Sequence, residues 1–464
     1  MKTDYRLGYI VFLSLVAAIG GILFGYDTAV ISGTIDQVAD EFHLTVLEQG
    51  WFVGCALIGS IVGVAFTGIL SDRLGRRFTM FIAAFLFTAS GIWCSFSCNF
   101  CVLVLARFIG GLGIGNISIV APMYISEIAV TKYRGRLVSL YQLAITLGFL
   151  TAYLTNYMLL NISKTASFSS DFFQQIFVDD VWRSMFGMEA IPAFIFFIIL
   201  FFIPESPRWL IMHHRENKAS EIYSHIYTSH AEARRQIEDT ESTLSSKSES
   251  EWRTLFEPGI FKSVIVGLCI AMLGQFMGVN AVLYYGPSIF KDAGISNPLF
   301  CQVLVGIVNT VGTIIAMFII DKFGRKKLIY YGVTGMIIDL LCIAFYFIEK
   351  TPLNLSTYIM PVFFLLYVFC CAVSISAVVW VLLSEMYPNR IRGLAMSIAG
   401  FALWIGTYLI GQLTPWLLQN LTPAGTFILF AVMCIPYLLI MWKMIPETAG
   451  MSLEEIERYW TKGK

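Results

Sequence analysis

An aspartate in an apolar stretch is the side chain of this sequence best placed to do chemistry. Residues 22–33 read ILFGYDTAVISG, with Asp27 near the middle. A charged side chain at the centre of a membrane costs about 2.5 to 3.5 kcal/mol on insertion scales, so such residues usually face the protein interior and pair with one another. Asp27 therefore predicts a polar interior and a neutralising partner.

Three other ionisable residues stand inside apolar stretches. Arg107 begins RFIGGLGIG, Glu189 lies in FGMEAIPA, and Asp339 lies in GMIIDLLCIAF. We expect Glu189 to be structural. We expect Asp339 to meet a polar neighbour or to lie near the membrane interface, because an isolated charge in hydrocarbon is unfavourable.

The composition is that of a membrane protein. Of 464 residues, 57% are hydrophobic and 13% are charged, whereas soluble domains carry about 25% charged residues. The formal net charge is zero, which gives no electrostatic reason to expect nucleic-acid binding. No nucleotide loop, metal-ligand cluster or nucleophile–base spacing stands out, so we expect no enzyme, no cofactor and no metal.

Twelve apolar windows are long enough to cross a membrane, since a bilayer core needs about 20 residues of helix. They fall near residues 10–33, 50–70, 77–98, 100–122, 137–160, 184–203, 263–289, 298–320, 327–347, 358–384, 393–412 and 425–445. We predict an all-α membrane protein with two six-helix bundles, one at 1–205 and one at 259–464 that includes a short cytoplasmic tail. The charged stretch 206–258 predicts a cytoplasmic linker with short helices.

Basic residues indicate the orientation in the membrane. Lys and Arg gather after the even-numbered spans, as at Arg76 and Arg134, whereas the loop at 34–49 has four acidic residues and no Lys or Arg. Because cytoplasmic loops carry an excess of Lys and Arg, both termini are predicted to be cytoplasmic. The expected location is the cell (inner) membrane.

The two predicted bundles share motifs. SDRLGRR recurs as IDKFGRKK, SEIAVTKYRGR as SEMYPNRIRGL, and PES as PET. Such halves in the same orientation are one architecture of secondary transporters. Charge-assisted hydrogen bonds between facing copies could hold the cytoplasmic side shut, although the charges could also be membrane anchors alone. The predicted cytoplasmic gate comprises Asp72, Arg76, Glu127, Arg134, Asp321, Arg325, Glu385 and Arg392.

With these motifs the chain resembles the sugar porter family of the major facilitator superfamily, and most of all its bacterial D-xylose–proton symporters. The resemblance runs from residue 22 to residue 450 in family order. It rests on FGYDTAVISGT, GILSDRLGRR, RFIGGLGIG, PMYISEIA, RGR, PESPRWL, QFMGVNAVLYY, DKFGRKK, SEMYPNRIRG and PETAG. It implies two bundles that rock around a central polar site and expose it alternately to each side.

The resemblance implies a role for two of the charges in apolar stretches. In the resembled symporters, the residues that match Asp27 and Arg107 pair and couple to protons. We therefore expect Asp27 to carry the proton and Arg107 to be its partner. Passive members of the family lack the acid, so Asp27 favours symport over uniport. The alternative is a permanent salt bridge that only stabilises packing.

A sugar site needs amides and aromatic rings. Asn and Gln offer donors and acceptors to sugar hydroxyls, and Trp and Tyr offer an apolar platform. Phe24 is expected to form a wall one turn before Asp27. Each of these residues could instead serve helix packing. The positions that match the family's sugar contacts are Gln142, Gln275, Asn280, Tyr284, Trp380 and Trp404.

Departures from the family pattern leave the sugar itself unspecified. Gly274 replaces the first of two glutamines in span 7, and Leu403 replaces a glutamine of the xylose symporters. Ser376 and Ala377 replace a Gly-Pro pair, which puts the hinge of span 10 in question, although Ser376 could still loosen the backbone. Because absent hydroxyl contacts change specificity strongly, the sequence predicts the sugar class and not the sugar.

The predicted function is import of a monosaccharide, a xylose-like pentose or a hexose, with a proton by alternating access. The expected partners are the sugar, the proton and membrane lipid, and we expect a monomer. One alternative is a facilitated uniporter for a sugar or an inositol-like polyol. Another is a sugar receptor that does not transport, although such receptors carry long cytoplasmic tails and only residues 446–464 follow the last span.

Overall fold

The structure, a computed structural model, describes residues 5–130, 133–245, 255–349, 356–388, 391–448, 451 and 453–462. The chain forms two compact units. Unit 1 comprises Met1–Thr28, Ile58–Ala152 and Ala166–Glu249, and unit 2 comprises Ala29–Leu57, Tyr153–Thr165 and Ser250–Lys464. Helices α1, α2 and α5 each contribute a part to both units. The predicted division into 1–205, 206–258 and 259–464 follows the chain halves instead and stays a prediction.

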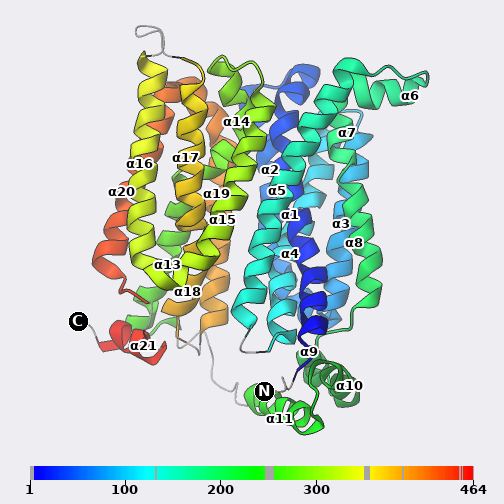
Figure 1. Cartoon of the computed structure of the whole chain (residues 1–464), viewed down its shortest axis with the longest axis vertical. Coiled ribbons are helices and arrows are strands. Elements are labelled where there is room, and N and C mark those ends of the chain that lie inside the picture. Colours follow the sequence, from blue (N-terminus) through cyan, green and yellow to red (C-terminus); the bar gives the residue numbers. More distant parts are fainter. Residues whose placement is uncertain are drawn as a thin grey trace. The chain divides into compact units, whose positions relative to one another are not determined.

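Twelve helical segments of the described residues are long and apolar enough to cross a membrane. Nine of them are α1 (Leu7–Phe42), α2 (Val46–Leu74), α3 (Arg76–Ser95), α4 (Phe100–Ile128), α5 (Arg134–Thr165), α15 (Pro298–Phe323), α16 (Arg325–Glu349), α19 (Arg392–Asn420) and α20 (Thr422–Met444). The other three are the interrupted segments Val181–Phe202, Gly259–Asp292 and Ile359–Met386. Each segment overlaps one predicted window, so the predicted twelve-span, all-α fold is confirmed (Figure 1).

Each interrupted segment divides at a short break. The first contains α7 (Val181–Gly187), α8 (Ala190–Ile199) and η2 (Leu200–Phe202); the second contains α13 (Pro258–Phe276) and α14 (Val279–Asp292); the third contains α17 (Ile359–Val373) and α18 (Ile375–Met386). At the second break Gly278 has φ +88°, a left-handed conformation that glycine adopts without steric cost.

Span 10 keeps its break although the family's proline is absent. Helices α17 and α18 separate at Ser374, with φ −108° and ψ −88°. The hydroxyl of Ser374 donates to the backbone carbonyl of Cys370 at 2.5 Å. A serine that bonds its own preceding turn competes with regular helix hydrogen bonds. The break thus lies two residues before Ser376, the residue that the sequence suggested.

Close helix crossings build unit 1. A Cβ atom on Gly25 of α1 would lie 3.0 Å from the Cα of Gly148 in α5. A Cβ atom on Gly59 of α2 would lie 3.0 Å from the Cα of Gly111 in α4. Small residues at such crossings let backbones approach closely within a membrane. The glycine-rich motif RFIGGLGIG therefore packs α4 tightly against α2.

Unit 2 joins helices from both halves of the sequence. Asp36 of α1 accepts a hydrogen bond from the hydroxyl of Ser288 in α14 at 2.8 Å. The hydroxyl of Tyr153 in α5 donates to the backbone carbonyl of Leu283 in α14 at 2.9 Å. The later parts of α1 and α5 are therefore fixed to α14.

Short helices lie outside the spans. The stretch 206–258 contains α9 (Pro207–Met212), α10 (Glu216–Ile226) and α11 (His230–Ser245), which confirms the predicted short helices. The backbone N–H of Arg6 donates to the carbonyl of Ile226 at 2.7 Å, so α10 is tied to the start of α1. The remaining short elements among the described residues are α6 (Asp171–Gln174), η1 (Gln175–Asp179) and α21 (Leu453–Lys462).

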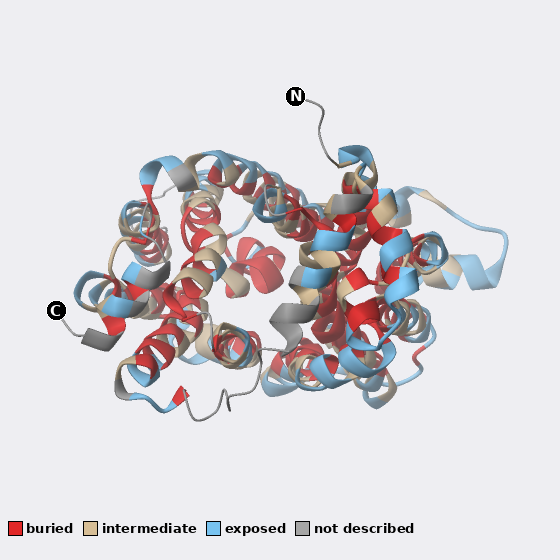
Figure 2. Ribbon diagram, turned by 90° about the horizontal axis from the view of Figure 1, so that it is seen from below, coloured by how far each residue is buried: buried red, intermediate tan, exposed pale blue. Residues whose placement is uncertain are grey.

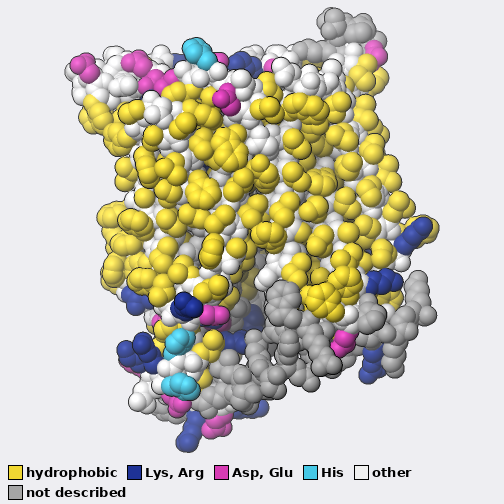
Figure 3. All heavy atoms as spheres, turned by 180° about the vertical axis from the view of Figure 1, so that it is seen from behind, with side chains coloured by type: hydrophobic (Ala, Val, Ile, Leu, Met, Phe, Trp, Pro, Cys, Tyr) yellow, Lys and Arg dark blue, Asp and Glu magenta, His cyan; other side chains and the backbone are white. Residues whose placement is uncertain are grey.

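The surface suits a lipid environment. Figure 2 shows buried residues on the helix sides that face other helices and exposed residues on the outer sides. On the face drawn in Figure 3, hydrophobic side chains cover the middle of the helices, and charged side chains lie near the helix ends. Within a bilayer every backbone polar group must be satisfied internally, and helices meet that requirement.

Candidate functional site

Asp27 and Arg107 form a buried ion pair in unit 1. Nη1 of Arg107 contacts Oδ1 of Asp27 and lies 3.3 Å from the Asp27 backbone carbonyl. The side chains are 0% and 2% exposed, respectively. The guanidinium carbon of Arg107 lies 5.2 Å from the centre of the Phe186 ring, a cation–π distance. Arg107 is thus the partner expected for Asp27.

Glycine leaves room for the Asp27 carboxylate. A Cβ atom on Gly110 would lie 2.6 Å from Oδ2 of Asp27 and 2.6 Å from Oγ of Ser90. The Ser90 hydroxyl donates to the backbone carbonyl of Ala106 at 2.9 Å. Oδ2 of Asp27 is buried and has no hydrogen-bond partner among the described residues. One carboxylate oxygen of the pair is therefore able to accept a proton.

Glu189 is a neighbouring acid that the sequence did not assign to this site. It lies at the break between α7 and α8 and is 1% exposed. Neither carboxylate oxygen has a hydrogen-bond partner within the described ranges, and the group interacts electrostatically with Asp27 and Arg107. A buried unpaired carboxylate is costly when it is ionised. Glu189 is therefore a candidate third member of the site formed by Asp27 and Arg107. Its signal in the sequence was an acid within an apolar span.

Two predicted sugar contacts meet in unit 2. Nδ2 of Asn280 donates to Oε1 of Gln275 at 2.7 Å. Residues five apart do not share a face of a regular helix, so the break at Gly278 is what brings Asn280 onto Gln275. The Thr407 hydroxyl donates to the same oxygen at 3.1 Å. Thr407 was not predicted, although it follows Trp404 by one turn of α19.

Three predicted aromatic residues lie on α14, α18 and α19. Trp404 is 7% exposed and Tyr284 is 2% exposed. Trp380 is 37% exposed, and its ring lies against α19, because a Cβ atom on Gly400 would lie 3.6 Å from Cη2 of Trp380. These rings belong to the same unit as Gln275.

The other two predicted sugar contacts lie in unit 1. Phe24 of α1 and Gln142 of α5 are half-buried. Phe24 precedes Asp27 by about one helical turn, as expected. Contact of either side chain with a sugar stays a prediction.

The charged motifs of the N-terminal half form one cluster. Nε of Arg76 lies 3.0 Å from Oε2 of Glu127, and its Nη1 lies 3.1 Å from Oδ1 of Asp72. The Ser206 hydroxyl also donates to Glu127. No hydrogen bond of Arg134 to Glu127 occurs in the described part of the chain. Arg76 is therefore the residue that holds Glu127.

The C-terminal half repeats this cluster. Nη2 of Arg325 lies 2.8 Å from Oε1 of Glu385, and the Thr448 hydroxyl donates to Oε2 of Glu385 at 2.6 Å. Arg392 donates to the backbone carbonyl of Tyr387 at 3.3 Å. The side chain of Asp321 lies outside the described residues. These ion pairs each join residues of one half, and a gate that joins the two halves stays a prediction.

Two acids missing from the predicted gate cap helices in these clusters. Glu205 accepts the backbone N–H groups of Arg76 at 2.9 Å and Arg77 at 3.1 Å. Glu447 accepts those of Arg325 at 3.0 Å and Lys326 at 3.1 Å. A carboxylate at a helix N-terminus is favourable. Burial raises the pKa of Glu205, although these hydrogen bonds act to lower it. The PES–PET repeat was the signal.

The sequence as a whole matches one family. Residues 13–460 match the family model described as "Sugar (and other) transporter". The chain belongs to the sugar transporter family. It is 38% identical to the arabinose–proton symporter of Bacillus subtilis over 99% of this chain and 97% of the relative. It is 35% identical to the D-xylose–proton symporter of Escherichia coli over the same shares.

A solved structure of the family shares the fold. The inward-open xylose transporter from Escherichia coli superposes with a TM-score of 0.83 and 34% identity, over 97% of this chain and all of that chain. The predicted major facilitator fold and sugar porter membership are therefore confirmed. This sugar transporter is a multi-pass membrane protein and not an enzyme.

Gly274 and Leu403, which depart from the family's sugar contacts, have defined neighbours in the structure. A Cβ atom on Gly274 would lie 3.7 Å from Ile375 and 3.8 Å from the Tyr437 ring, which are ordinary contact distances. The carbonyl of Leu403 accepts from the Thr407 hydroxyl at 2.9 Å. A small residue is therefore accommodated at position 274, beside the ring of Tyr437.

Asp339 meets a polar neighbour, which was one of its two expected placements. It is 7% exposed on α16, and its carboxylate interacts with the thiol of Cys370 on α17. Gly335, about one turn earlier, makes room for that thiol, because a Cβ atom there would lie 2.7 Å from Sγ of Cys370. This contact links α16 and α17 near the break in span 10.

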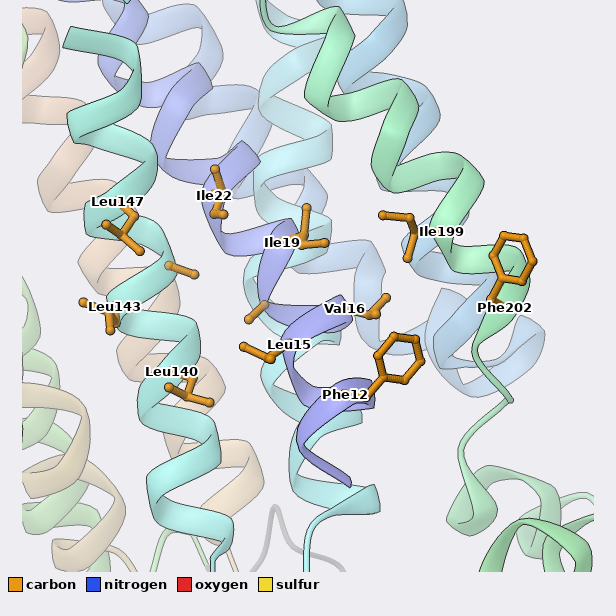
Figure 4. Close-up of a pocket in the computed structure, with 12 residues that line it drawn as sticks. Phe12, Leu15, Val16, Ile19, Ile22, Leu140, Leu143, Leu147, Ile199 and Phe202 are labelled. Carbon is orange, nitrogen blue, oxygen red and sulfur yellow. The ribbon is translucent and has the colours of Figure 1, made fainter. Parts of the chain in front are cut away.

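An apolar pocket of about 550 Å³ lies between α1, α5 and the α8–η2 segment (Figure 4). Its lining residues are Phe12, Leu15, Val16, Ala18, Ile19, Ile22, Leu140, Leu143, Ala144, Leu147, Ile199 and Phe202. A sugar requires hydrogen-bond donors and acceptors from its site. These side chains offer neither, so the pocket does not suit a sugar.

Proposed function

We propose that this protein imports a monosaccharide, a xylose-like pentose or a hexose, together with a proton by alternating access. The buried Asp27–Arg107 ion pair carries the proposal, because an ionisable residue within a membrane span commonly belongs to a proton path. The relatives named arabinose–proton and D-xylose–proton symporters support it.

In this proposal Asp27 carries the proton and Arg107 is its conformation-dependent partner. Protonation removes the negative charge of Asp27, so a charge-assisted pair becomes a weaker hydrogen bond and α1 is freer to move against α4. Loss of the proton restores the pair. Glu189 adds a second acid beside a single guanidinium, which makes full ionisation of the group unfavourable.

We propose that the sugar is held by polar and aromatic side chains on six helices. Amides bind its hydroxyls in both directions, and rings cover its C–H face. The Gln275–Asn280 hydrogen bond supports this role for the amides. The proposed contacts are Phe24, Gln142, Gln275, Asn280, Tyr284, Trp380 and Trp404.

The remaining expectations belong to the same proposal. We place both termini in the cytoplasm and the protein in the cell (inner) membrane as a monomer. Its domains are 1–205, 206–258 and 259–464. Membrane lipid is a further partner, and nucleic acid is not. The duplicated Arg–Glu pairs support a cytoplasmic gate. Its proposed members are Asp72, Arg76, Glu127, Arg134, Asp321, Arg325, Glu385 and Arg392.

Counterflow in proteoliposomes tests the substrate class. Vesicles with purified protein are loaded with an unlabelled pentose, hexose or inositol, and uptake of the labelled compound is followed. We expect transient accumulation for at least one monosaccharide. Binding of a sugar without any exchange would favour the receptor, and exchange of inositol alone would favour a polyol carrier.

The variant Asp27→Asn tests proton coupling. A gradient of one pH unit is worth about 1.4 kcal/mol per proton, which sustains about tenfold sugar accumulation at one proton per sugar. We expect Asp27→Asn to keep counterflow and to lose this accumulation. The control is Asp40→Asn, which removes an exposed carboxylate from the same helix and should accumulate sugar normally. Unchanged accumulation by Asp27→Asn refutes the coupling role of Asp27. No accumulation by the wild type favours the uniporter.

A further inference from the structure

Gln275 is held at its carboxamide oxygen by two donors from different helices. Nδ2 of Asn280 in α14 lies 2.7 Å from Oε1, and Oγ1 of Thr407 in α19 lies 3.1 Å from it. A carboxamide oxygen has two lone pairs, and these two donors occupy both. The NH2 group of Gln275 is therefore the half of the amide that is left to meet a ligand.

The backbone of α19 supports this orientation. A Cβ atom on Gly406 would lie 3.1 Å from Cβ and 3.2 Å from Cγ of Gln275. The absence of a side chain at Gly406 thus lets the stem of Gln275 lie directly on α19. Thr407 is 4% exposed, whereas Gln275 and Asn280 are half-buried. The threonine is shielded while the amides can be reached.

The Thr407 hydroxyl connects the amide to the helix that carries Trp404. Its hydrogen has two acceptors within reach, Oε1 of Gln275 at 3.1 Å and the backbone carbonyl of Leu403 at 2.9 Å. One hydrogen shared in this way ties the amide to the turn of α19 that contains Trp404. Loss of the hydroxyl leaves Asn280 as the single described donor to Oε1.

We propose that Thr407 is a positioning residue that fixes the Gln275 carboxamide with its NH2 group toward the sugar. The inference rests on the proposed function and deepens it, because it assigns the polarity of one sugar contact. Gln275 then donates to an oxygen of the sugar and does not accept from it. The site selects a sugar that presents an acceptor at that point, and Thr407 acts without touching the sugar.

Sugar analogues distinguish a donating amide from an accepting one. Replacing a hydroxyl by fluorine keeps a weak acceptor and removes the donor, whereas a deoxy position has neither. A site that donates therefore binds the fluoro analogue better than the deoxy analogue at the contacted position. A site that accepts binds both equally poorly, because its acceptor is left unpaired in each case.

The test uses full-length protein in proteoliposomes and competition of monofluoro and monodeoxy analogues against counterflow of the transported sugar. In the wild type we expect one ring position at which fluoro binds about 5- to 10-fold better than deoxy, the size of one hydrogen bond. Thr407→Val should raise the half-saturating sugar concentration about 5- to 10-fold. It should also reduce the fluoro–deoxy ratio toward one, with the maximal exchange rate nearly unchanged.

Three variants separate positioning from stability. Thr407→Ser keeps the hydroxyl, so its half-saturating sugar concentration and its fluoro–deoxy ratio should equal those of the wild type. Gly406→Ala crowds the stem of Gln275 and should act like Thr407→Val. Thr414→Val is the matched control, because the Thr414 hydroxyl is fully buried and donates to the carbonyl of Ile410 four residues earlier. It removes the same kind of backbone contact on the same helix and should leave both values unchanged.

The outcomes are distinct. No exchange by the wild type overturns the proposed function, and this inference with it. Exchange by the wild type, with an unchanged ratio and half-saturation in both Thr407→Val and Gly406→Ala, overturns the inference alone. Equal weakness of fluoro and deoxy analogues at every position in the wild type also overturns it, because Gln275 then accepts. Equal effects of Thr407→Val and Thr414→Val reduce Thr407 to a stability role and overturn it as well.

Discussion

At the scale of single residues, the feature that matters most is how the Asp27 carboxylate is accommodated inside a membrane protein. Arg107 supplies the opposite charge, and the missing side chain of Gly110 supplies the space. Removing one partner of a buried ion pair typically costs about 3 to 5 kcal/mol, because the other charge stays buried. A substitution that keeps both charges and only fills the space beside the Asp27 carboxylate therefore tests the role of Asp27 with a smaller loss of stability.

Gly110→Ala is such a change. The added methyl group would stand 2.6 Å from Oδ2 of Asp27 and from Oγ of Ser90, so one of them must move. Overpacking of this kind costs about 1 to 3 kcal/mol. We expect proton-driven accumulation to fall several-fold, with a smaller loss of counterflow. In Gly113→Ala, on the same helix, the methyl group meets neighbours at 3.4 Å, and transport should stay close to normal. Equal transport by the two variants contradicts the prediction.

At the scale of elements, breaks in helices decide which side chains meet. The break at Gly278 turns α14 relative to the end of α13, and Asn280 thereby reaches Gln275. The break at Ser374 occurs without the proline that is usual in the family. Discontinuous helices near the midplane are where many secondary transporters bind substrate. Their geometry therefore matters to function as much as residue type.

Gly278→Ala tests the first of these breaks. Its φ of +88° disfavours any residue with a Cβ atom, and that atom would lie 2.6 Å from Cε2 of Phe430. We expect a loss of about 1 to 3 kcal/mol in stability, seen as a lower melting temperature in detergent. Gly274→Ala, in the same span, meets neighbours at 3.7 and 3.8 Å and should melt like the wild type. A normal melting temperature for Gly278→Ala refutes the argument.

At the scale of the whole molecule, the chain repeats one charged cluster in both sequence halves. Arg76 and Arg325 each hold a glutamate, and Ser206 and Thr448 each donate a hydroxyl to that glutamate. Glu205 and Glu447 cap the helices that start at the two arginines. The repeat therefore extends from motif letters to individual hydrogen bonds.

Neutralising the held glutamates should affect transport more than folding. We expect Glu127→Gln to lower the maximal exchange rate about tenfold, the effect of about 1.4 kcal/mol on one state of the cycle. Glu385→Gln should have a smaller effect, because its ion pair is more exposed, at 12% and 22% against 5% and 6%. The control Glu238→Gln breaks a pair that is 84% and 66% exposed and should change nothing. Wild-type rates in both variants, at normal expression, contradict a gate.

Much of this molecule was predictable, and each correct feature had its own signal in the sequence. The twelve spans follow from hydropathy, and the duplication follows from motifs whose spacing survives in both halves. The partner of Asp27 followed from the family resemblance and from the need for a cation. Thr407, Glu205 and Glu447 were missed because a threonine in a helix or a glutamate near a helix end looks ordinary until its neighbours are known.

The sequence by itself determined the spans, the repeat and the residue types of the site, because these depend on composition and on distance along the chain. Only the tertiary structure decided which groups meet. The Asp27–Arg107 contact joins residues 80 positions apart, and the Gln275–Thr407 contact joins residues 132 positions apart. The first contact depends on the space that Gly110 leaves beside the Asp27 carboxylate, and the second depends on the close approach of Gln275 to α19 at Gly406.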